Sequence, residues 1–370
     1  MSTASDPIVR FEKIQKTYDG EHYVVKSLDL DIERGEFLTL LGPSGSGKST
    51  CLMMLAGFES PTRGKIVLDG TELNNIPPYK RDIGVVFQNY ALFPHMTVAE
   101  NVAFPLMIRK TPASEVQDRV KRALDMVQLG GFGDRKPAQL SGGQQQRVAC
   151  ARALVFDPKL VLLDEPLGAL DKKLRESMQI ELKHIHESLG VTMVFVTHDQ
   201  DEALTMSDRI AVFNDGIIQQ ISDPQTLYDE PSNAFVANFI GETNMLDGRV
   251  MSLNGDHCQV ALDRGGSIIA RQHGELQVNE PIKVSIRPEQ AHCVDLEADV
   301  QFANQLSSKV VETIYHGDHL RLSLDITGNG EDRAGFMVKI PTNSLHGSLN
   351  GGQPITVGFH PDDCRALSVQ

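Results

Sequence analysis

A glycine-rich segment that directly follows a short apolar run constrains this fold more than any other feature of the chain. The run at residues 37–41 reads as a buried strand, and a helical pattern begins at Lys48 and ends near Gly57. This strand–loop–helix context predicts a phosphate-binding P-loop rather than an ordinary turn. The residues that fit its pattern, G-x-x-x-x-G-K-[ST] with one residue beyond, are Gly42, Pro43, Ser44, Gly45, Ser46, Gly47, Lys48, Ser49 and Thr50.

The residue types in this loop suit a bound triphosphate. Glycines allow the backbone to approach phosphate oxygens that a Cβ would keep away. The N–H groups of the loop and of the first helical turn would point at the anion, and the helix dipole adds partial positive charge there. Lys48 is expected to neutralise the β- and γ-phosphates and the Ser49 hydroxyl to ligate Mg²⁺. The sequence therefore predicts a site for a nucleoside triphosphate with Mg²⁺.

A second glycine-rich segment opens another expected helix. Ser141 stands where an N-cap residue would stand, and a helical pattern runs from Gln145 to Phe156. The chain thus has two helix N-termini that suit an anion, but one P-loop. An economical arrangement is two copies packed head to tail, in which Ser141 and Gly143 of one copy cover the γ-phosphate held by the other.

This second segment, residues 140–144, reads LSGGQ, and on that motif the chain resembles the ATPase subunits of ABC transporters. The resemblance covers nearly the whole chain. It implies that the nucleotide is ATP and that Ser141, Gly143 and Gln144 contact it from the second copy.

A further apolar run, residues 160–163, is followed by two carboxylates, Asp164 and Glu165. Such a run fits a strand buried on both faces, and with its carboxylates it resembles the Walker B strand of the same family. The resemblance implies that Asp164 supports Mg²⁺ and that Glu165 accepts a proton from the attacking water as general base.

Four more positions match the family one by one. Gln88 resembles the Q-loop glutamine, which implies that it senses Mg²⁺ and the attacking water. Asp171 resembles the D-loop aspartate, in a segment that crosses the dimer interface. His198 resembles the switch histidine, which can donate a hydrogen bond to the γ-phosphate. Tyr18 resembles the aromatic residue that stacks on adenine, although a tyrosine near an N-terminal hairpin often serves in packing alone.

Polar residues follow three of the expected strands, at Gly42, at Asp164 and at His198. In open α/β sheets, ligands bind in the crevice outside the C-terminal ends of the strands. We therefore expect these separate motifs to meet in one crevice.

Composition and charge narrow the range of partners. The 370 residues are 41% hydrophobic and carry a net charge of −14, which argues against nucleic-acid binding because such proteins show a basic patch. No apolar run approaches the roughly 18 residues of a membrane span, and residues 1–7 lack the features of a signal peptide. The five cysteines form no C-x-x-C pair and are expected to be reduced. We expect a soluble cytoplasmic protein that reaches a membrane only through a partner.

The chain is long enough for more than one domain. Up to residue 238, expected strands and helices alternate as in an α/β domain; its first part is rich in strands, and residues 89–155 resemble the helical subdomain of the family. Beyond it, short alternating runs separated by Gly, Asn and Asp predict a small all-β barrel. We expect an α/β P-loop NTPase domain over 1–238 and an OB-like barrel over 239–370, which resembles the TOBE domain. That domain is expected to stabilise a dimer, with a regulatory ligand site as the alternative.

Together with the TOBE resemblance, the motifs imply the ATP-hydrolysing subunit of an ABC importer. Its partners would be a second copy of itself, two membrane permease subunits and a solute-binding protein, with attachment at the cytoplasmic face of the membrane. Segments 75–81 and 89–97 look closest to polyamine (spermidine/putrescine) transport ATPases, and relatives for iron(III), sulfate, sugars and aminoethylphosphonate differ little there. The alternative class is a non-transport ATP-dependent clamp, but those proteins typically carry coiled-coil inserts, paired cassettes or basic surfaces.

Residues 90–96 form an unusually apolar run in what should be a loop. Loops normally run over the surface, and clustered exposed apolar groups often mark protein interfaces. We expect Tyr90, Leu92, Phe93 and Met96 to face a membrane partner, the alternative being that they pack the helical subdomain. Because the run follows Gln88, a partner pressing on it would move a residue of the hydrolytic site.

Overall fold

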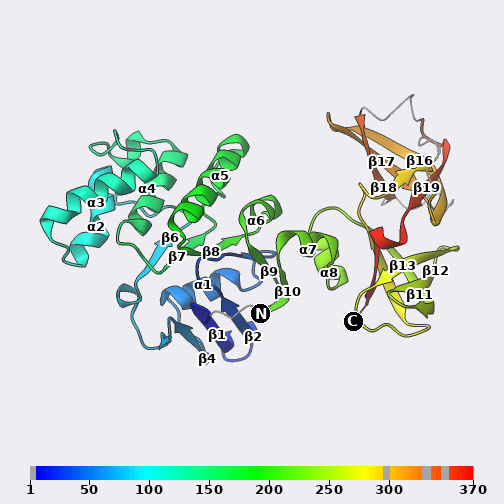
Figure 1. Ribbon diagram of the computed structural model, residues 1–370, viewed down its shortest axis with the longest axis horizontal. Coiled ribbons are helices and arrows are strands. Elements are labelled where there is room, and N and C mark those ends of the chain that lie inside the picture. The colour runs from blue at the N-terminus through cyan, green and yellow to red at the C-terminus, as the bar shows by residue number, and fades with distance from the viewer. Residues whose placement is uncertain (1–5, 295–300, 327–334, 343–349, 370) are drawn as a thin grey trace. The chain divides into compact units, whose positions relative to one another are not determined.

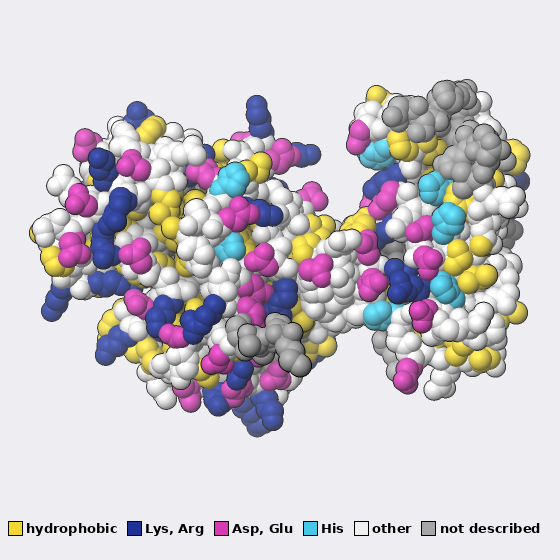
Figure 2. Space-filling model, viewed as in Figure 1, with side chains coloured by type: hydrophobic (Ala, Val, Ile, Leu, Met, Phe, Trp, Pro, Cys, Tyr) yellow, Lys and Arg dark blue, Asp and Glu magenta, His cyan; other side chains and the backbone are white. Residues whose placement is uncertain are grey.

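The computed structural model describes residues 6–294, 301–326, 335–342 and 350–369, and the chain divides into two compact units, Met1–Gln225 and Thr226–Gln370 (Figure 1). Residues 1–5 lie outside the described residues. They belong to the segment 1–7, in which the sequence shows no features of a signal peptide. In the described part of the chain, no helix combines the length and the apolar character that crossing a bilayer requires. On the face drawn in Figure 2, acidic and basic side chains are interspersed over each unit.

A strand-rich sheet begins the first unit, in the order β2-β1-β4-β5. Along β1, buried and less buried residues alternate, which is the pattern of a sheet with one face on a core. The antiparallel register pairs Val9 with Ile32 in β2 and with Leu68 in β4. The strands are Val9–Thr17 (β1), Tyr23–Ile32 (β2), Arg63–Leu68 (β4) and Thr71–Glu72 (β5).

The central sheet of this unit has the order β10-β9-β3-β8-β7-β6, and β3, β6, β7, β8 and β9 pair in parallel. Both of its faces are covered. In β7, Leu160 and Leu162 pack with α1 (Lys48–Ala56) on one side, while Val161 and Leu163 pack with the helices on the other. This alternation follows from the two-residue period of a strand. The strands are Phe37–Leu41 (β3), Ile83–Val86 (β6), Leu160–Asp164 (β7), Thr192–Thr197 (β8), Arg209–Asn214 (β9) and Ile217–Ser222 (β10).

Helices follow the strands as the sequence predicts, and α2, α3 and α4 gather at one end of the unit (Figure 1). Thr97 and Glu100 form a capping box that begins α2. That helix continues through Pro105, and Pro112 is the N-cap residue of α3. The helices are Lys48–Ala56 (α1), Val98–Ile108 (α2), Ala113–Met126 (α3), Gly142–Leu154 (α4), Lys172–Leu189 (α5) and Gln200–Met206 (α6).

The second unit contains a closed barrel, β11-β12-β13-β20-β14, and also a separate sheet, β15-β19-β16-β17-β18. The all-β character and the closed barrel are as expected, and the structure adds the separate sheet: residues 282–286 lie in β14 of the barrel, whereas residues 320–324 lie in β17 of the other sheet. The strands are Asn244–Asn254 (β11), His257–Leu262 (β12), Ser267–Gln272 (β13), Pro281–Ile286 (β14), His292–Cys293 (β15), Asn304–Tyr315 (β16), His319–Asp325 (β17), Phe336–Pro341 (β18), Pro354–Phe359 (β19) and Cys364–Ser368 (β20).

The boundary between the units precedes the expected one, because residue 238 falls within α8 (Ala234–Phe239) of the second unit. A buried arginine just after β14 explains this. The Arg287 guanidinium donates hydrogen bonds to the backbone carbonyls of Ala237, at 3.1 Å, and of Tyr228 in α7 (Pro224–Asp229), at 2.9 Å. These bonds tie the chain around residues 228–240 to the barrel.

Candidate active site

The P-loop is a tight backbone cradle between β3 and α1. Gly47 caps the helix with a φ of 104°, a left-handed conformation that favours glycine. A Cβ on Gly47 would lie 2.7 Å from the carbonyl oxygen of Val24, so the loop has no room for a side chain at this position. The N-terminus of α1 is therefore left open to an anion.

Lys48 lies within this cradle. Its Nζ donates to the carbonyl oxygens of Gly42 and Pro43, both at 2.8 Å. Burial lowers the pKa of Lys48, and the nearby charges of Glu165 and Asp164 oppose that shift. The loop carbonyls thus hold an ammonium group where the phosphates of a nucleotide would sit, and the cradle and its cation fit a triphosphate.

A serine and an aspartate meet beside the cradle. The Ser49 hydroxyl donates to Oδ1 of Asp164 at 3.1 Å. The pKa of Asp164 is raised above its usual value, chiefly by burial. The hydrogen bond from Ser49 opposes this shift, and the charges of Glu165 and Lys48 have smaller effects. A half-buried carboxylate and a hydroxyl are oxygen ligands of the kind that Mg²⁺ prefers, so this pair fits the metal.

Three polar side chains from separate strand ends meet next to that pair. Oε2 of Glu165 accepts a hydrogen bond from Nε2 of Gln88 at 3.3 Å, and Oε1 lies 3.2 Å from Nδ1 of His198. The sheet order explains the meeting, because β7 lies between β6 and β8 and all three residues follow the C-terminal ends of these parallel strands.

Glu165 is held there in an uncommon backbone conformation. Its φ is 43°, a left-handed value that costs about 1–3 kcal/mol in a non-glycine residue. Its N–H donates to the carbonyl of Val196 in β8 at 3.0 Å, which helps to hold the turn. In this conformation the carboxylate lies between Gln88 and His198.

The LSGGQ segment forms a capping box at the start of α4. The Ser141 Oγ accepts from the Gln144 N–H at 3.3 Å, and Oε1 of Gln144 accepts from the Ser141 N–H at 3.0 Å. The Ser141 hydroxyl therefore still has its own hydrogen to donate. A Cβ on Gly143 would approach Leu174 of α5 to 3.0 Å, so close packing accounts for a small residue there.

Asp171 and Tyr18 are the two remaining predicted positions. Asp171 is the N-cap of α5, where its Oδ1 accepts from the Leu174 N–H at 3.0 Å. Tyr18 follows β1 with 61% of its surface exposed and has Nζ of Lys16 at 4.6 Å from its ring centroid. The tyrosine thus has an accessible ring, and its contact with adenine remains a prediction.

Sequence reasoning missed Arg175, which joins the segments that contain Asp171 and His198. The guanidinium donates to the carbonyl of Leu170 and to Oδ2 of Asp199, both at 3.1 Å. It also lies 3.7 Å from Glu202, a buried residue of α6. The one local signal was an arginine in the first turn of a helix, where the dipole disfavours a cation.

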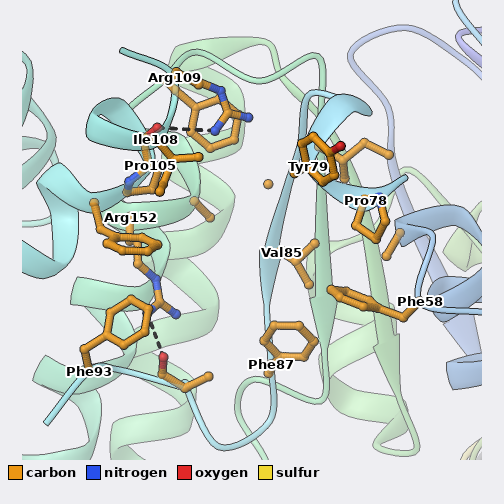
Figure 3. Close-up of a pocket in the computed structure, with 17 residues that line it drawn as sticks. Phe58, Pro78, Tyr79, Val85, Phe87, Phe93, Pro105, Ile108, Arg109 and Arg152 are labelled. Atoms are coloured by element: carbon orange, nitrogen blue, oxygen red, sulfur yellow. Dashed lines mark hydrogen bonds between the residues drawn. The ribbon is translucent and has the colours of Figure 1, made fainter. Parts of the chain in front are cut away.

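A groove of about 470 Å³ lies between the helical subdomain and the rest of the first unit. Figure 3 shows Phe93, Pro105 and Arg152 on one wall, Phe58 and Tyr79 on the other, and Val85 and Phe87 between the walls. Phe58, Tyr79 and Ile108 are more than half exposed. The groove thus presents aromatic and aliphatic surface to the outside.

The apolar run at residues 90–96 contributes less of this surface than the sequence suggested. Phe93 lines the groove, with its ring 4.6 Å from that of Phe104. Tyr90, in contrast, is only 7% exposed and belongs to the core, and Leu92 packs against the same core. The expectation that Tyr90 faces a partner is therefore wrong, because its side chain points into the core, whereas Leu92 is only partly buried.

All five cysteines are buried, and none of them forms a disulfide. Burial raises the pKa of Cys51 and of Cys150 to about 12. Because the thiolate is the reactive form, both behave as small core residues.

Two family profiles match the chain: "ABC transporter" over residues 25–168 and "TOBE domain" over residues 284–367. Close relatives span nearly the whole chain. It is 48% identical to the spermidine/putrescine import ATP-binding protein PotA of Rubrobacter xylanophilus, over 97% of this chain and 93% of that protein. It is also 48% identical to the protein of the same name from Clostridium acetobutylicum, over 98% and 97%.

Solved structures resemble the first unit. An ATP-binding cassette described as a dimer in a post-hydrolysis state with ADP and Pi is 38% identical, with a TM-score of 0.53, over 58% of this chain and 98% of that one. A component of the cbiONQ ABC transporter complex from Clostridium perfringens is 31% identical, with a TM-score of 0.57, over 61% and 92%. Fold, motifs and relatives agree: this chain binds ATP and belongs to the family of ABC transporter ATP-binding proteins that carry a C-terminal TOBE domain.

Proposed function

We propose that this protein is the ATPase subunit of a membrane importer for spermidine and putrescine. The meeting of Gln88, Glu165 and His198 beside the Ser49–Asp164 pair supports ATP hydrolysis most directly. The names of the relatives support import of polyamines. Iron(III), sulfate, sugars and aminoethylphosphonate are the alternative solutes.

The residues divide the work as follows. Lys48 and the N–H groups of the P-loop hold the phosphates. Ser49 and Asp164 would hold Mg²⁺, which neutralises charge that develops on the phosphate oxygens. Glu165 takes the proton of the attacking water, Gln88 orients that water, and His198 donates a hydrogen bond to the γ-phosphate.

The active form is a homodimer with two composite sites. The N-terminus of α4, with Ser141, Gly143 and Gln144, faces the γ-phosphate bound by the second copy. Asp171 lies at the interface between the copies, and Tyr18 stacks on adenine. A solved relative described as a dimer supports this arrangement.

The assembled importer contains the homodimer, two permease subunits and a solute-binding protein. The groove beside Phe93 and Tyr79 receives a helix of the permease, because it is concave and apolar and opens next to the turn that follows Gln88. The ATPase is thereby held at the cytoplasmic face of the membrane through its permeases.

The solute is tested by reconstituting the chain with its permeases and binding protein in vesicles. Spermidine or putrescine is expected to stimulate ATP hydrolysis and to accumulate inside, whereas sulfate, maltose and aminoethylphosphonate are not. Stimulation by one of those other solutes would keep the importer but overturn the polyamine assignment. An absence of ATP-driven uptake of any of them would count against the importer itself.

Replacing His198 with alanine is expected to lower kcat by about 10²-fold or more, the usual loss when a donor to a charged transition state is removed. The affinity for ADP should hardly change, because ADP lacks the γ-phosphate. Phosphate release and ADP calorimetry measure the two effects. His184→Ala in α5 is the matched control and should be active. Equal weakening of ATP and ADP binding would show that His198 is structural.

Replacing Phe93 and Ile108 with serine is expected to prevent assembly with the permeases. Both residues line the groove, and each buried side chain of this size contributes about 1.5–3 kcal/mol. Leu92 is a poorer choice because it packs against the core. Ile180→Ser is the control, because Ile180 of α5 is about as exposed as Ile108. Co-purification of the double variant with the permeases at the wild-type level would place the docking surface elsewhere.

A further inference from the structure

The turn after Gln88 contains two consecutive residues with left-handed backbones that are not glycine: Tyr90, with a φ of 60°, and Ala91, with a φ of 46°. Non-glycine residues persist in this conformation only when their surroundings hold them there. The Tyr90 N–H donates to the carbonyl of Phe87, and the Ala91 N–H donates to that of Asn89. These bonds lie within the turn itself. Beyond the packing of the Tyr90 side chain on the core, the carbonyl oxygens of Tyr90 and Ala91 need a polar contact from outside the turn.

Arg152 supplies that contact. Its guanidinium donates from one nitrogen to the carbonyl oxygen of Tyr90 and from another to that of Ala91, both at 2.7 Å. The bond to Ala91 is drawn as a dashed line below Arg152 in Figure 3. In the described part of the chain no carboxylate pairs with Arg152, and burial lowers its pKa. A charged side chain is thus committed to two carbonyls of one strained turn.

Arg152 also has contacts in two other directions. It lies in the wall of the groove, with its guanidinium 5.9 Å from the ring centroid of Phe93. It belongs to the last turn of α4, whose first turn is capped by Ser141. The 13 residues of α4 span about 20 Å at 1.5 Å per residue, so one rigid helix connects the groove to the N-terminus that carries Ser141.

We propose that Arg152 is a positioning residue that makes the turn after Gln88 and α4 move as one body. A permease helix that presses on Phe93 then shifts Gln88 beside Glu165 in one ATP site, and shifts Ser141 in the site shared with the second copy. This inference rests on the proposed docking in the groove for its physiological role. The link between the turn and α4 can be tested without a permease.

The first test uses the full-length chain with Arg152→Met, which keeps bulk and removes both hydrogen bonds. Hydrogen exchange at Tyr90 and Ala91 is expected to speed up. The ATP-induced dimer, formed in a Glu165→Gln background and followed by light scattering, should weaken by about tenfold, a typical size for coupling between sites. Arg109→Met is the matched control, since Arg109 lines the same groove but donates to the carbonyl of Pro105 instead. It should retain slow exchange in the turn.

The second test separates positioning from simple stabilisation. Ala91→Gly relieves the left-handed strain at one of the two residues, so in the Arg152→Met background it should restore the melting temperature but not the dimer. Arg152→Lys, which keeps the charge but not the planar fork, should be intermediate in both. If the glycine also restores the dimer, or if the dimer of Arg152→Met is as tight as wild type, Arg152 does no more than hold the fold.

The assembled importer supplies the last measurement. Stimulation of ATP hydrolysis by the permeases should fall in Arg152→Met with the Ala91→Gly change present, while co-purification with the permeases persists. Full stimulation would contradict the link between the groove and α4. If the Phe93 and Ile108 variant shows that docking occurs elsewhere, the proposed groove fails, but the weakened dimer of Arg152→Met would still support the link between the turn and α4.

Discussion

Replacing Glu165 with glutamine is expected to lower kcat for ATP hydrolysis by about 10²–10⁴-fold, the usual contribution of a general base, while ATP binding is retained. An amide has the shape of the carboxylate but cannot take a proton. The amide oxygen can still accept a hydrogen bond from Gln88, whose Nε2 lies 3.3 Å from Oε2 of Glu165 in the wild-type structure. The site should therefore keep its geometry and lose its base. Phosphate release and ATP calorimetry, measured on the same preparation, check both parts.

A matched control removes a carboxylate elsewhere. Glu115→Gln breaks the ion pair with Arg119, at 3.7 Å on the exposed face of α3, and should leave kcat near the wild-type value because exposed pairs contribute little. Phosphate release by Glu165→Gln at the wild-type rate would remove Glu165 from the role of base. A loss of ATP binding would instead show that its carboxylate holds the site together.

Replacing Ser141 with arginine is expected to abolish turnover while each monomer still binds one ATP. The bulky cation would occupy the position that faces the γ-phosphate of the second copy, but Lys48 and the rest of the P-loop are unaltered. Mixing this variant with Lys48→Ala should recover part of the activity. One composite site of that mixed dimer then combines an intact Lys48 with an intact Ser141.

A second variant distinguishes the role of Ser141 as a helix cap from its contact with ATP. Ser141 caps α4 through Gln144, and loss of such a cap costs about 0.5–2 kcal/mol. Ser141→Asp keeps a good cap but directs a carboxylate at a phosphate, so it should fold like wild type and still fail to turn over. Light scattering should show no ATP-induced dimer for Ser141→Asp. A mixture with Lys48→Ala that recovers neither activity nor a dimer would count against the composite site.

The sequence alone determined the parts of this protein that local chemistry decides. The bounds of β3 agree with those read from the apolar run, and Gly57 ends α1 in a left-handed conformation. A buried strand, a glycine-rich turn and a helix start each leave a signal within a few residues. The positions of the motifs directly after expected strands also predicted that they meet in one crevice, because the C-terminal ends of parallel strands share one edge of a sheet. The roles of the residues that meet there await the experiments above.

The tertiary structure decided what depends on residues far apart in the sequence. An apolar run cannot show which of its side chains turn inward, so Tyr90 is buried where exposure was expected. The position of Arg175 in the first turn of a helix is unusual, but neither its sequence context nor that of Arg152 shows which backbone carbonyls these residues bind. In the second unit, β20 returns to pair with β13 and β14 and closes the barrel. Such pairings and buried hydrogen bonds form only when distant segments pack, since a short stretch of sequence cannot specify a partner that lies outside it.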